Sequence, residues 1–296
     1  MRDRPGCGIA GEAGPYGAAP DVVSRARPGR APPAAPVRHP WRHADHTDTG
    51  LPGFDRRRRH PGRRHRRPRR AARLLAGRPW LASARVVEER EGRGPGGRSL
   101  LHLATDWPGH RPRGPETVAV LVAAGADPDA RFTGAHRETP LHWAASNDDV
   151  PMIDALVAAG ADIEADGAVI AGGTPLTDAR AFGQWNAARR LLELGARPTF
   201  QDAATLGLLD RVEARLATAP PPSPEEITQA FWGACQGGRL PTAARLLEHG
   251  ADIDRIGWDR LTPLDIARAG QADEVVAWLT DRGARTRAER EAADRT

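Results

Sequence analysis

The pattern of apolar and polar positions between residues 70 and 290 predicts a series of short paired helices. Apolar residues recur at helical spacing within short segments, as at Ile153, Leu156 and Val157. A Gly follows such segments where a left-handed residue would end the helix, as Gly160 does. A single pair of this length cannot bury its own apolar face, so we expect the pairs to stack and to share a core.

A recurring motif sets the register of these pairs. Each clear copy begins with Thr-Pro-Leu, and Gly-Ala follows 21 residues after its Thr. The clear copies begin at Thr139, Thr174 and Thr262 and end at Gly160-Ala161, Gly195-Ala196 and Gly283-Ala284. Two looser copies begin at Ser99 and Gln229, and a degenerate unit begins near Pro198.

The residue types of the motif have physical reasons. The Thr hydroxyl caps the first helix of a unit, and Pro fits its first position because no N–H partner is needed there. Acidic pairs after Gly-Ala suit a turn into a projecting β-hairpin. These pairs are Asp127/Asp129, Asp162/Glu164 and Asp252/Asp254.

This pattern resembles the ankyrin repeat, whose period is 33 residues and whose signature is Thr-Pro-Leu-His-x-Ala, as in Thr139–Ala144. The resemblance implies an all-α solenoid of stacked helix-turn-helix units with β-hairpin fingers. We place it at residues 70–290, as about six repeats plus a partial N-terminal one. It also implies a protein–protein interaction module without catalytic activity, whose protein partner the sequence does not identify.

The spacing between unit starts predicts a row of fingers that is interrupted in its middle. Intervals of 40 residues from Ser99 to Thr139 and 35 from Thr139 to Thr174 leave room for fingers, but 24 from Thr174 to Pro198 do not. The proline-rich segment Ala219–Pro224 is incompatible with a normal hairpin. We therefore expect two binding patches separated by a local cleft.

Two segments depart from the repeat. The unit that begins at Ser99 has five extra residues within Trp107–Pro115, between its two helices. Gly92–Gly97 has no recognisable strand before it, and we interpret it as a flexible loop.

Residues 1–69 are rich in Arg, Pro and Gly, and we expect them to form a disordered tail. Ala71–Leu75 nevertheless matches the second helix of a repeat, although no first helix precedes it. Reading Arg59–Pro68 one base later permits a repeat-like sequence, so one hypothesis is that the tail is out of frame or has the wrong start codon. The other hypothesis is that Arg56–Arg70 is a genuine basic arm. Such an arm would bind nucleic acid or an acidic lipid surface by counterion release, but no aromatic residues interleave it for base stacking. We therefore keep nucleic-acid or acidic-surface binding as the alternative function and expect no nucleic-acid partner.

Charge and composition exclude several kinds of chemistry. All 43 basic residues are Arg, which excludes a lysine-dependent nucleotide loop and a lysine Schiff base. The composition is typical of GC-rich bacterial genes. Residues 1–70 carry a net charge of +11, whereas residues 71–296 carry −6. Two cysteines, no apolar run of about 18 residues and no secretory signal lead us to expect a cytoplasmic protein without a membrane segment.

Candidate partner-binding residues occupy finger tips and the ends of first helices, where aromatic and Arg side chains act as interface anchors. Those at finger tips are Trp258, Asp259, Arg260, Arg131, Phe132, His136 and Arg137, and those in or just after first helices are Trp107 and Trp185.

Other conspicuous residues have structural interpretations. His102 and His142 fill the signature position, where we expect a hydrogen bond between neighbouring units. Cys235 and the tryptophans Trp143, Trp232 and Trp278 are expected in or partly in the core.

We find no sequence signal for an enzyme, a cofactor or a metal site. Neither Gly-x-Ser-x-Gly nor His-Glu-x-x-His occurs, and His43-Ala44-Asp45-His46 has no companion ligands at a suitable spacing. The second hypothesis is an enzymatic site in the loops Asp106–Glu116 and Asp166–Gly173, which a convergent cluster of titratable groups would support. We expect a monomer with Arg285–Arg295 as a polar cap.

Overall fold

The computed structural model describes residues 67–90, 94–257 and 260–293. The basic residues from 56 to 66, the proposed frame disruption and most of the predicted tail lie outside the described residues. Helix α1 (Arg67–Gly77) begins three residues before the predicted boundary at residue 70.

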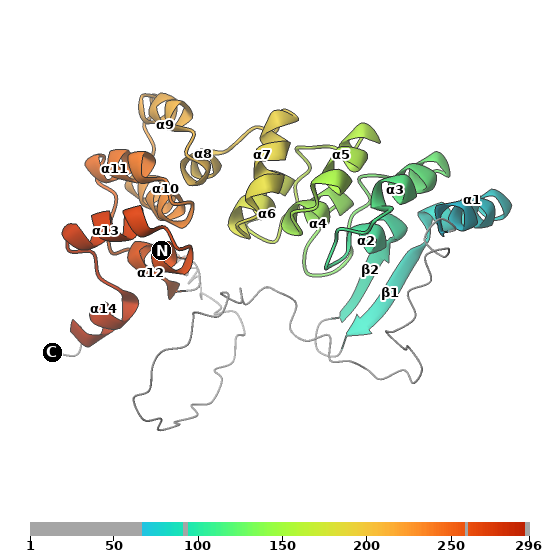
Figure 1. The fold of residues 1–296 in the computed structure, drawn as a ribbon, viewed down its shortest axis with the longest axis horizontal. Helices are drawn as coiled ribbons and strands as arrows, with labels where there is room; N and C mark the ends of the chain where they lie inside the picture. Colours follow the sequence, from blue (N-terminus) through green and yellow to red (C-terminus); the bar gives the residue numbers. More distant parts are fainter. Residues whose placement is uncertain (1–66, 91–93, 258–259, 294–296) are drawn as a thin grey trace, which may run out of the picture. The chain divides into compact units, whose positions relative to one another are not determined.

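Helix pairs follow α1 along the chain, and equivalent helices of neighbouring pairs contact one another (Figure 1). Helices α2, α4 and α6 pack side by side, and so do the second helices α1, α3, α5 and α7. The bounds are α2 (Leu100–Thr105), α3 (Gly114–Ala123), α4 (Pro140–Ser146), α5 (Val150–Ala158), α6 (Pro175–Ala181) and α7 (Trp185–Glu193).

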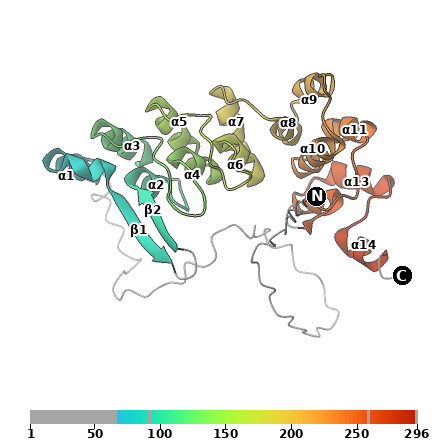
Figure 2. The ribbon, with the colours of Figure 1, turned by 180° about the vertical axis from the view of Figure 1, so that it is seen from behind.

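The C-terminal helices repeat this arrangement (Figure 2). They are α8 (Phe200–Leu206), α9 (Leu209–Leu216), α10 (Pro224–Gln236), α11 (Leu240–Glu248), α12 (Pro263–Ala269), α13 (Asp273–Asp281) and α14 (Arg287–Ala293). The described residues thus contain the partial unit α1, six helix pairs and the terminal helix α14. This confirms the predicted stacking of helix-turn-helix units.

The first finger is longer than the others and forms the only regular hairpin among the described residues. A short 3-10 helix, η2 (Pro79–Ser83), leads into the antiparallel strands β1 (Arg85–Arg90) and β2 (Gly94–Ser99). The interpretation of Gly92–Gly97 as a flexible loop is therefore wrong for its described residues. The reason is that these residues pair with β1 along the hairpin. A tertiary contact adds to this pairing: Gly97 and Thr133 exchange backbone hydrogen bonds of 2.7 and 3.1 Å, and a Cβ at Gly97 would lie 2.3 Å from the Thr133 hydroxyl.

Reciprocal caps define where the first helices begin. At Ser99, Thr139, Thr199, Ser223 and Thr262 the hydroxyl faces the third helical residue, whose side chain bonds back to the capping residue.

Two predicted unit starts need correction. The fourth unit begins at Thr199 instead of Pro198, because Thr199 supplies the capping hydroxyl. Helix α10 begins at Pro224, ahead of Gln229, because Ser223 and Glu226 form a capping box of their own. The extra turns make α10 the longest helix of the described chain, at 13 residues.

The buried apolar residues fall into two clusters that meet between α7 and α8. The first extends from Leu75 to Ala196, and the second from Ala203 to Ala284. No strand or finger is present between α7 and α8 or in the proline-rich segment before α10. The predicted interruption of the finger row is thus confirmed, whereas the cleft stays a prediction.

Helices long and apolar enough to span a bilayer are absent from the described residues.

Candidate functional site

The first three fingers are held to one another by direct contacts. They comprise residues 79–99, 127–138 and 162–173, which we call the first, second and third fingers. The Gly97–Thr133 bridge joins the first to the second. Arg85 reinforces it, since its Nη1 donates to the carbonyl oxygen of Arg131 at 2.6 Å.

Arg131, a predicted contact residue, links the second finger to the third. It forms an ion pair with Asp166 at 2.8 Å, donates to the Arg137 carbonyl at 3.2 Å and also bonds the Asp166 carbonyl. Gly167 lies against the Arg137 carbonyl, and a Cβ at Gly167 would be 2.4 Å from that carbonyl oxygen. Arg131 thus has a structural role, and its side chain remains 30% exposed.

Phe132 packs inward and is half-buried. Its ring lies 5.7 Å from that of Trp143 and 6.4 Å from that of His102, between ring centroids. His102 and Trp143 are themselves in edge contact at 4.9 Å. Phe132 therefore supports the finger from beneath, and Trp143 has the partly buried position that the sequence predicted.

His136 and Arg137 complete the group of predicted residues on the second finger. Arg137 is exposed and His136 is half-buried. Burial lowers the pKa of His136, so its ring is predominantly neutral near pH 7. The structure thus places four predicted residues on one finger, of which Arg137 offers the most accessible charge.

The remaining predicted residues lie elsewhere. Trp107 is 55% exposed in the extra loop between α2 and α3, and Trp185 is half-buried as the first residue of α7. Both lie where the first helix of a unit connects to the second, Trp107 in the connecting loop and Trp185 at the start of the second helix. Arg260 is exposed on the last finger and faces Glu291 of α14 at 3.7 Å. Trp258 and Asp259 lie outside the described residues.

The signature histidines tie neighbouring units together, as predicted. His102 Nε2 faces the Glu138 carbonyl at 3.1 Å, and His142 Nε2 faces the Gly173 carbonyl at 3.3 Å. Burial lowers the pKa of each to about 4, so both rings are neutral. Since a carbonyl oxygen only accepts, Nε2 carries the proton and Nδ1 accepts from the cap.

A second set of bonds between units comes from the finger acids. In each case the second acid of a finger accepts a hydrogen bond from the backbone N–H that follows Gly-Ala in the next unit. The bonds run from Asp162 to Asp129 (2.9 Å), from Arg197 to Glu164 (2.8 Å) and from Arg285 to Asp254 (2.7 Å). We call this set the carboxylate ladder.

A buried pair of acids was missed by the sequence analysis. Glu138 immediately precedes the capping Thr139, and Asp178 lies in α6 with both carboxylate oxygens buried. Burial raises the pKa of Glu138 to about 7, and burial together with the charge of Glu138 raises that of Asp178 well above its usual range. Aligning the units could have revealed Asp178, since it occupies the position of Trp143.

This acid pair does not form an accessible catalytic centre. Asp178 is fully buried and Glu138 is only 8% exposed. Cys235 is also buried in the core, as predicted, and burial raises its pKa far above the usual range. Within the described ranges, no group of three or more His, Cys, Asp or Glu side chains is arranged to hold a metal ion.

Stacked helix pairs joined by fingers define a helical-repeat solenoid, and comparison with known proteins identifies the kind of repeat. Residues 101–202 match the family model for ankyrin repeats in three copies. The chain therefore contains ankyrin repeats. Ankyrin repeats generally mediate protein–protein interactions.

Individual relatives share the repeats over part of their length. An ankyrin repeat and KH domain-containing protein of Caenorhabditis briggsae is 31% identical over 179 residues, which cover 57% of this chain and 7% of the relative. The crystal structure of the human ASB11 ankyrin repeat domain is 28% identical, with a TM-score of 0.39, covering 64% of this chain and 85% of that domain.

Proposed function

We propose that the chain binds a protein partner through the surface of its first three fingers and catalyses no reaction. The observation that carries this proposal is the mutual locking of the fingers by Arg131 and Gly97. A surface fixed before binding loses less conformational freedom on association, which favours affinity.

The composition of the fingers supports the same conclusion. Arg85 and Arg137 expose guanidinium groups, and Val87 is 61% exposed on strand β1. Arg is enriched at protein interfaces because its planar group stacks and forms several hydrogen bonds at once. We propose that Arg137 is a principal contact and that Arg131 and Phe132 hold the surface in shape.

The other predicted contacts, Trp107, Trp185, Trp258, Asp259 and Arg260, remain proposals for further partner contacts. We propose a monomer, because helix α14 covers the end of the last unit with polar side chains. A reducing cytoplasmic location is a separate proposal. Binding of nucleic acid or an acidic surface through residues 56–70 stays a separate prediction.

The test is affinity capture from the native host's lysate with the full chain and two charge-reversed variants. Arg137→Glu changes the second finger, and Arg189→Glu is the matched control, since Arg189 is exposed on helix α7. We expect a protein partner that is lost with Arg137→Glu and kept with Arg189→Glu. Equal capture by all three forms would exclude the finger surface, and capture abolished by nuclease would favour the basic arm.

A further inference from the structure

The carboxylate ladder lacks its first bond. Aligning Gly77-Arg78 with Gly125-Ala126 places Leu81 at the position that Asp129 and Glu164 occupy in the following fingers. A Leu side chain has no acceptor. The backbone N–H of Asp127 therefore has no carboxylate to donate to, whereas the equivalent N–H of Asp162 donates to the Asp129 carboxylate.

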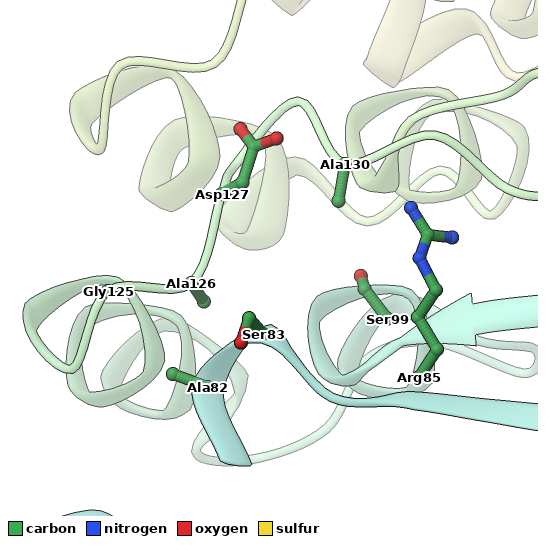
Figure 3. Close-up of a pocket in the computed structure, with 8 residues that line it drawn as sticks. All are labelled: Ala82, Ser83, Arg85, Ser99, Gly125, Ala126, Asp127 and Ala130. Carbon is green, nitrogen blue, oxygen red and sulfur yellow. The ribbon is translucent and has the colours of Figure 1, made fainter. Parts of the chain in front are cut away.

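The unfilled position coincides with a pocket. The N–H of Asp127 has no hydrogen-bond partner in the part of the chain that the structure describes. A pocket of about 210 Å³ separates the end of η2 from Asp127 (Figure 3). Its lining consists of Ala82, Ser83, Arg85, Ser99, Gly125, Ala126, Asp127 and Ala130.

Arg85 supplies a positive charge at the edge of this pocket. Its Nη1 is engaged by the carbonyl oxygens of Arg131 and Gly97, which fix the guanidinium against the second finger. Its Nε and Nη2 make no hydrogen bond to any described residue, so they remain available as donors. Figure 3 shows Arg85 and Asp127 on different sides of the pocket.

We propose that this pocket binds a carboxylate group of the partner protein, which takes the place of the acid missing from the first finger. The carboxylate accepts a hydrogen bond from the Asp127 N–H, as Asp129 does from Asp162, and pairs with the free donors of Arg85. The inference rests on the proposed partner-binding function and adds the chemistry that the partner must present.

The side chain of Asp127 does not oppose this assignment, because the ladder contains the same juxtaposition. Asp162 donates its N–H to the Asp129 carboxylate while its own Oδ1 accepts from the Glu164 N–H at 2.9 Å. Asp127 Oδ1 accepts from the Asp129 N–H in the same way, also at 2.9 Å. A singly charged carboxylate is thus tolerated beside an Asp, whereas a doubly charged phosphate would meet greater repulsion.

The pocket is tested with small probes on the isotope-labelled full chain, by following the amide resonance of Asp127. N-acetyl-aspartate N-methylamide presents a side-chain carboxylate, N-acetylglycine presents a terminal one, and N-acetyl-asparagine N-methylamide is the neutral control. We expect a saturable shift with the carboxylates and none with the neutral probe. The carboxylate that saturates at the lower concentration identifies which source the pocket prefers.

Two variants give opposite expected effects. Arg85→Gln removes the positive charge and should weaken binding roughly fivefold. Asp127→Asn keeps the acceptor for Asp129 but removes a negative charge, and should strengthen binding by a factor on the order of three. Arg189→Gln, on the exposed face of helix α7, is the control for a general loss of positive charge and should leave binding unchanged.

The proposal is overturned if neither carboxylate shifts the Asp127 amide, or if Arg85→Gln and Arg189→Gln weaken binding equally. If Arg85→Gln alters the spectrum of the whole chain, the Asp127→Asn variant provides the test instead. Carboxylate binding that is unchanged or weaker in Asp127→Asn also overturns the proposal. None of these results depends on the partner, so their failure is distinguishable from failure of the proposed function.

Discussion

Arg180 and Asp202 form a buried ion pair between α6 and α8, where the two apolar clusters meet. The Arg180 Nε lies 2.9 Å from Asp202 Oδ1, and the two side chains are 5% and 0% exposed. Gln236 also crosses this joint by donating to the Ala181 carbonyl at 3.2 Å. Polar contacts thus contribute to coupling the two halves where the finger contacts are interrupted.

Replacing Arg180 with Met should destabilise the joint. Removal of one partner leaves a buried carboxylate, which costs about 3–5 kcal/mol. We expect urea unfolding, followed by tryptophan fluorescence and circular dichroism, to separate into two transitions as the halves uncouple.

Two further variants test the cause. The double variant Arg180→Met, Asp202→Asn keeps an acceptor for the α8 cap but removes the unpaired charge, so it should be more stable than Arg180→Met alone. Arg190→Gln breaks the exposed pair with Asp154 and should have little effect, since exposed pairs contribute little. A single transition with unchanged midpoint in Arg180→Met would contradict this role.

The buried acid Glu138 should make stability fall as pH rises. The folded chain keeps its proton up to a pKa of about 7, whereas the unfolded chain releases it near 4.5. The folded state therefore binds more protons between these values, and the free energy of unfolding decreases from pH 4.5 to 7. Glu138→Gln should be more stable than the wild type at pH 8, by at least about 1 kcal/mol.

This prediction is measured as the difference in unfolding free energy between variant and wild type from pH 4 to 8. His102 and His142 have the opposite dependence, since their lowered pKa values remove stability as pH falls from 6.5 to 4. Their contributions cancel in the difference. Parallel curves for the two proteins would show that Glu138 does not titrate in this range.

Short-range chemistry explains which features the sequence could predict. The bonds from His102 and His142 follow from a side chain at a fixed place in a repeat, and the interruption follows from spacing alone. Strand β2 could not be predicted in this way because it pairs with β1 and because its Gly97 bridges Thr133, which lies 36 residues away.

The same limitation applies to the candidate site. The tip position of Arg131 and Phe132 indicated contact residues, but their side chains turn toward Asp166 and Trp143. These orientations depend on the neighbouring units, which no single motif encodes. The proximity of Glu138 and Asp178 likewise cannot be predicted from one unit, because the two acids come from neighbouring units.

Asp254 should hold helix α14 on the last unit. Its carboxylate accepts from the backbone N–H and from Nε of Arg285, each at 2.7 Å, and its carbonyl accepts from Arg290. Asp254→Ala removes the two carboxylate bonds and should cost about 1–3 kcal/mol of stability.

The readout is limited tryptic digestion, which should cleave near Arg285 several times faster in Asp254→Ala. Asp281→Ala changes an exposed acid on α13 and serves as the matched control. Equal cleavage rates in the two variants would show that α14 is held by other contacts.

Gly97→Ala should separate the first finger from the second. The new Cβ would lie 2.3 Å from the Thr133 hydroxyl, so one strand must move at a cost of about 1–3 kcal/mol. We expect faster hydrogen exchange at the Gly97 and Thr133 amides.

Matched substitutions separate this contact from a general effect of alanine. Thr133→Ala in the Gly97→Ala background removes the clashing hydroxyl and should restore protection. Gly77→Ala should be neutral at this hairpin, because nothing lies within 4 Å of its new Cβ. Loss of protection that Thr133→Ala fails to restore would refute the steric explanation.

The carboxylate ladder also bears on how such a chain can lengthen. The unit that contains Gly160–Glu164 donates the Asp162 N–H to the preceding unit and offers the Glu164 carboxylate as an acceptor for the next. A tandem copy of this unit would enter the array with both bonds already encoded and would need no compensating change. After Gly195-Ala196-Arg197 the position equivalent to Glu164 is Thr199, which is not an acid, so a copy inserted after it receives no such bond from the preceding unit. Gene duplication is thereby favoured within the regular stretches and disfavoured at the interruption.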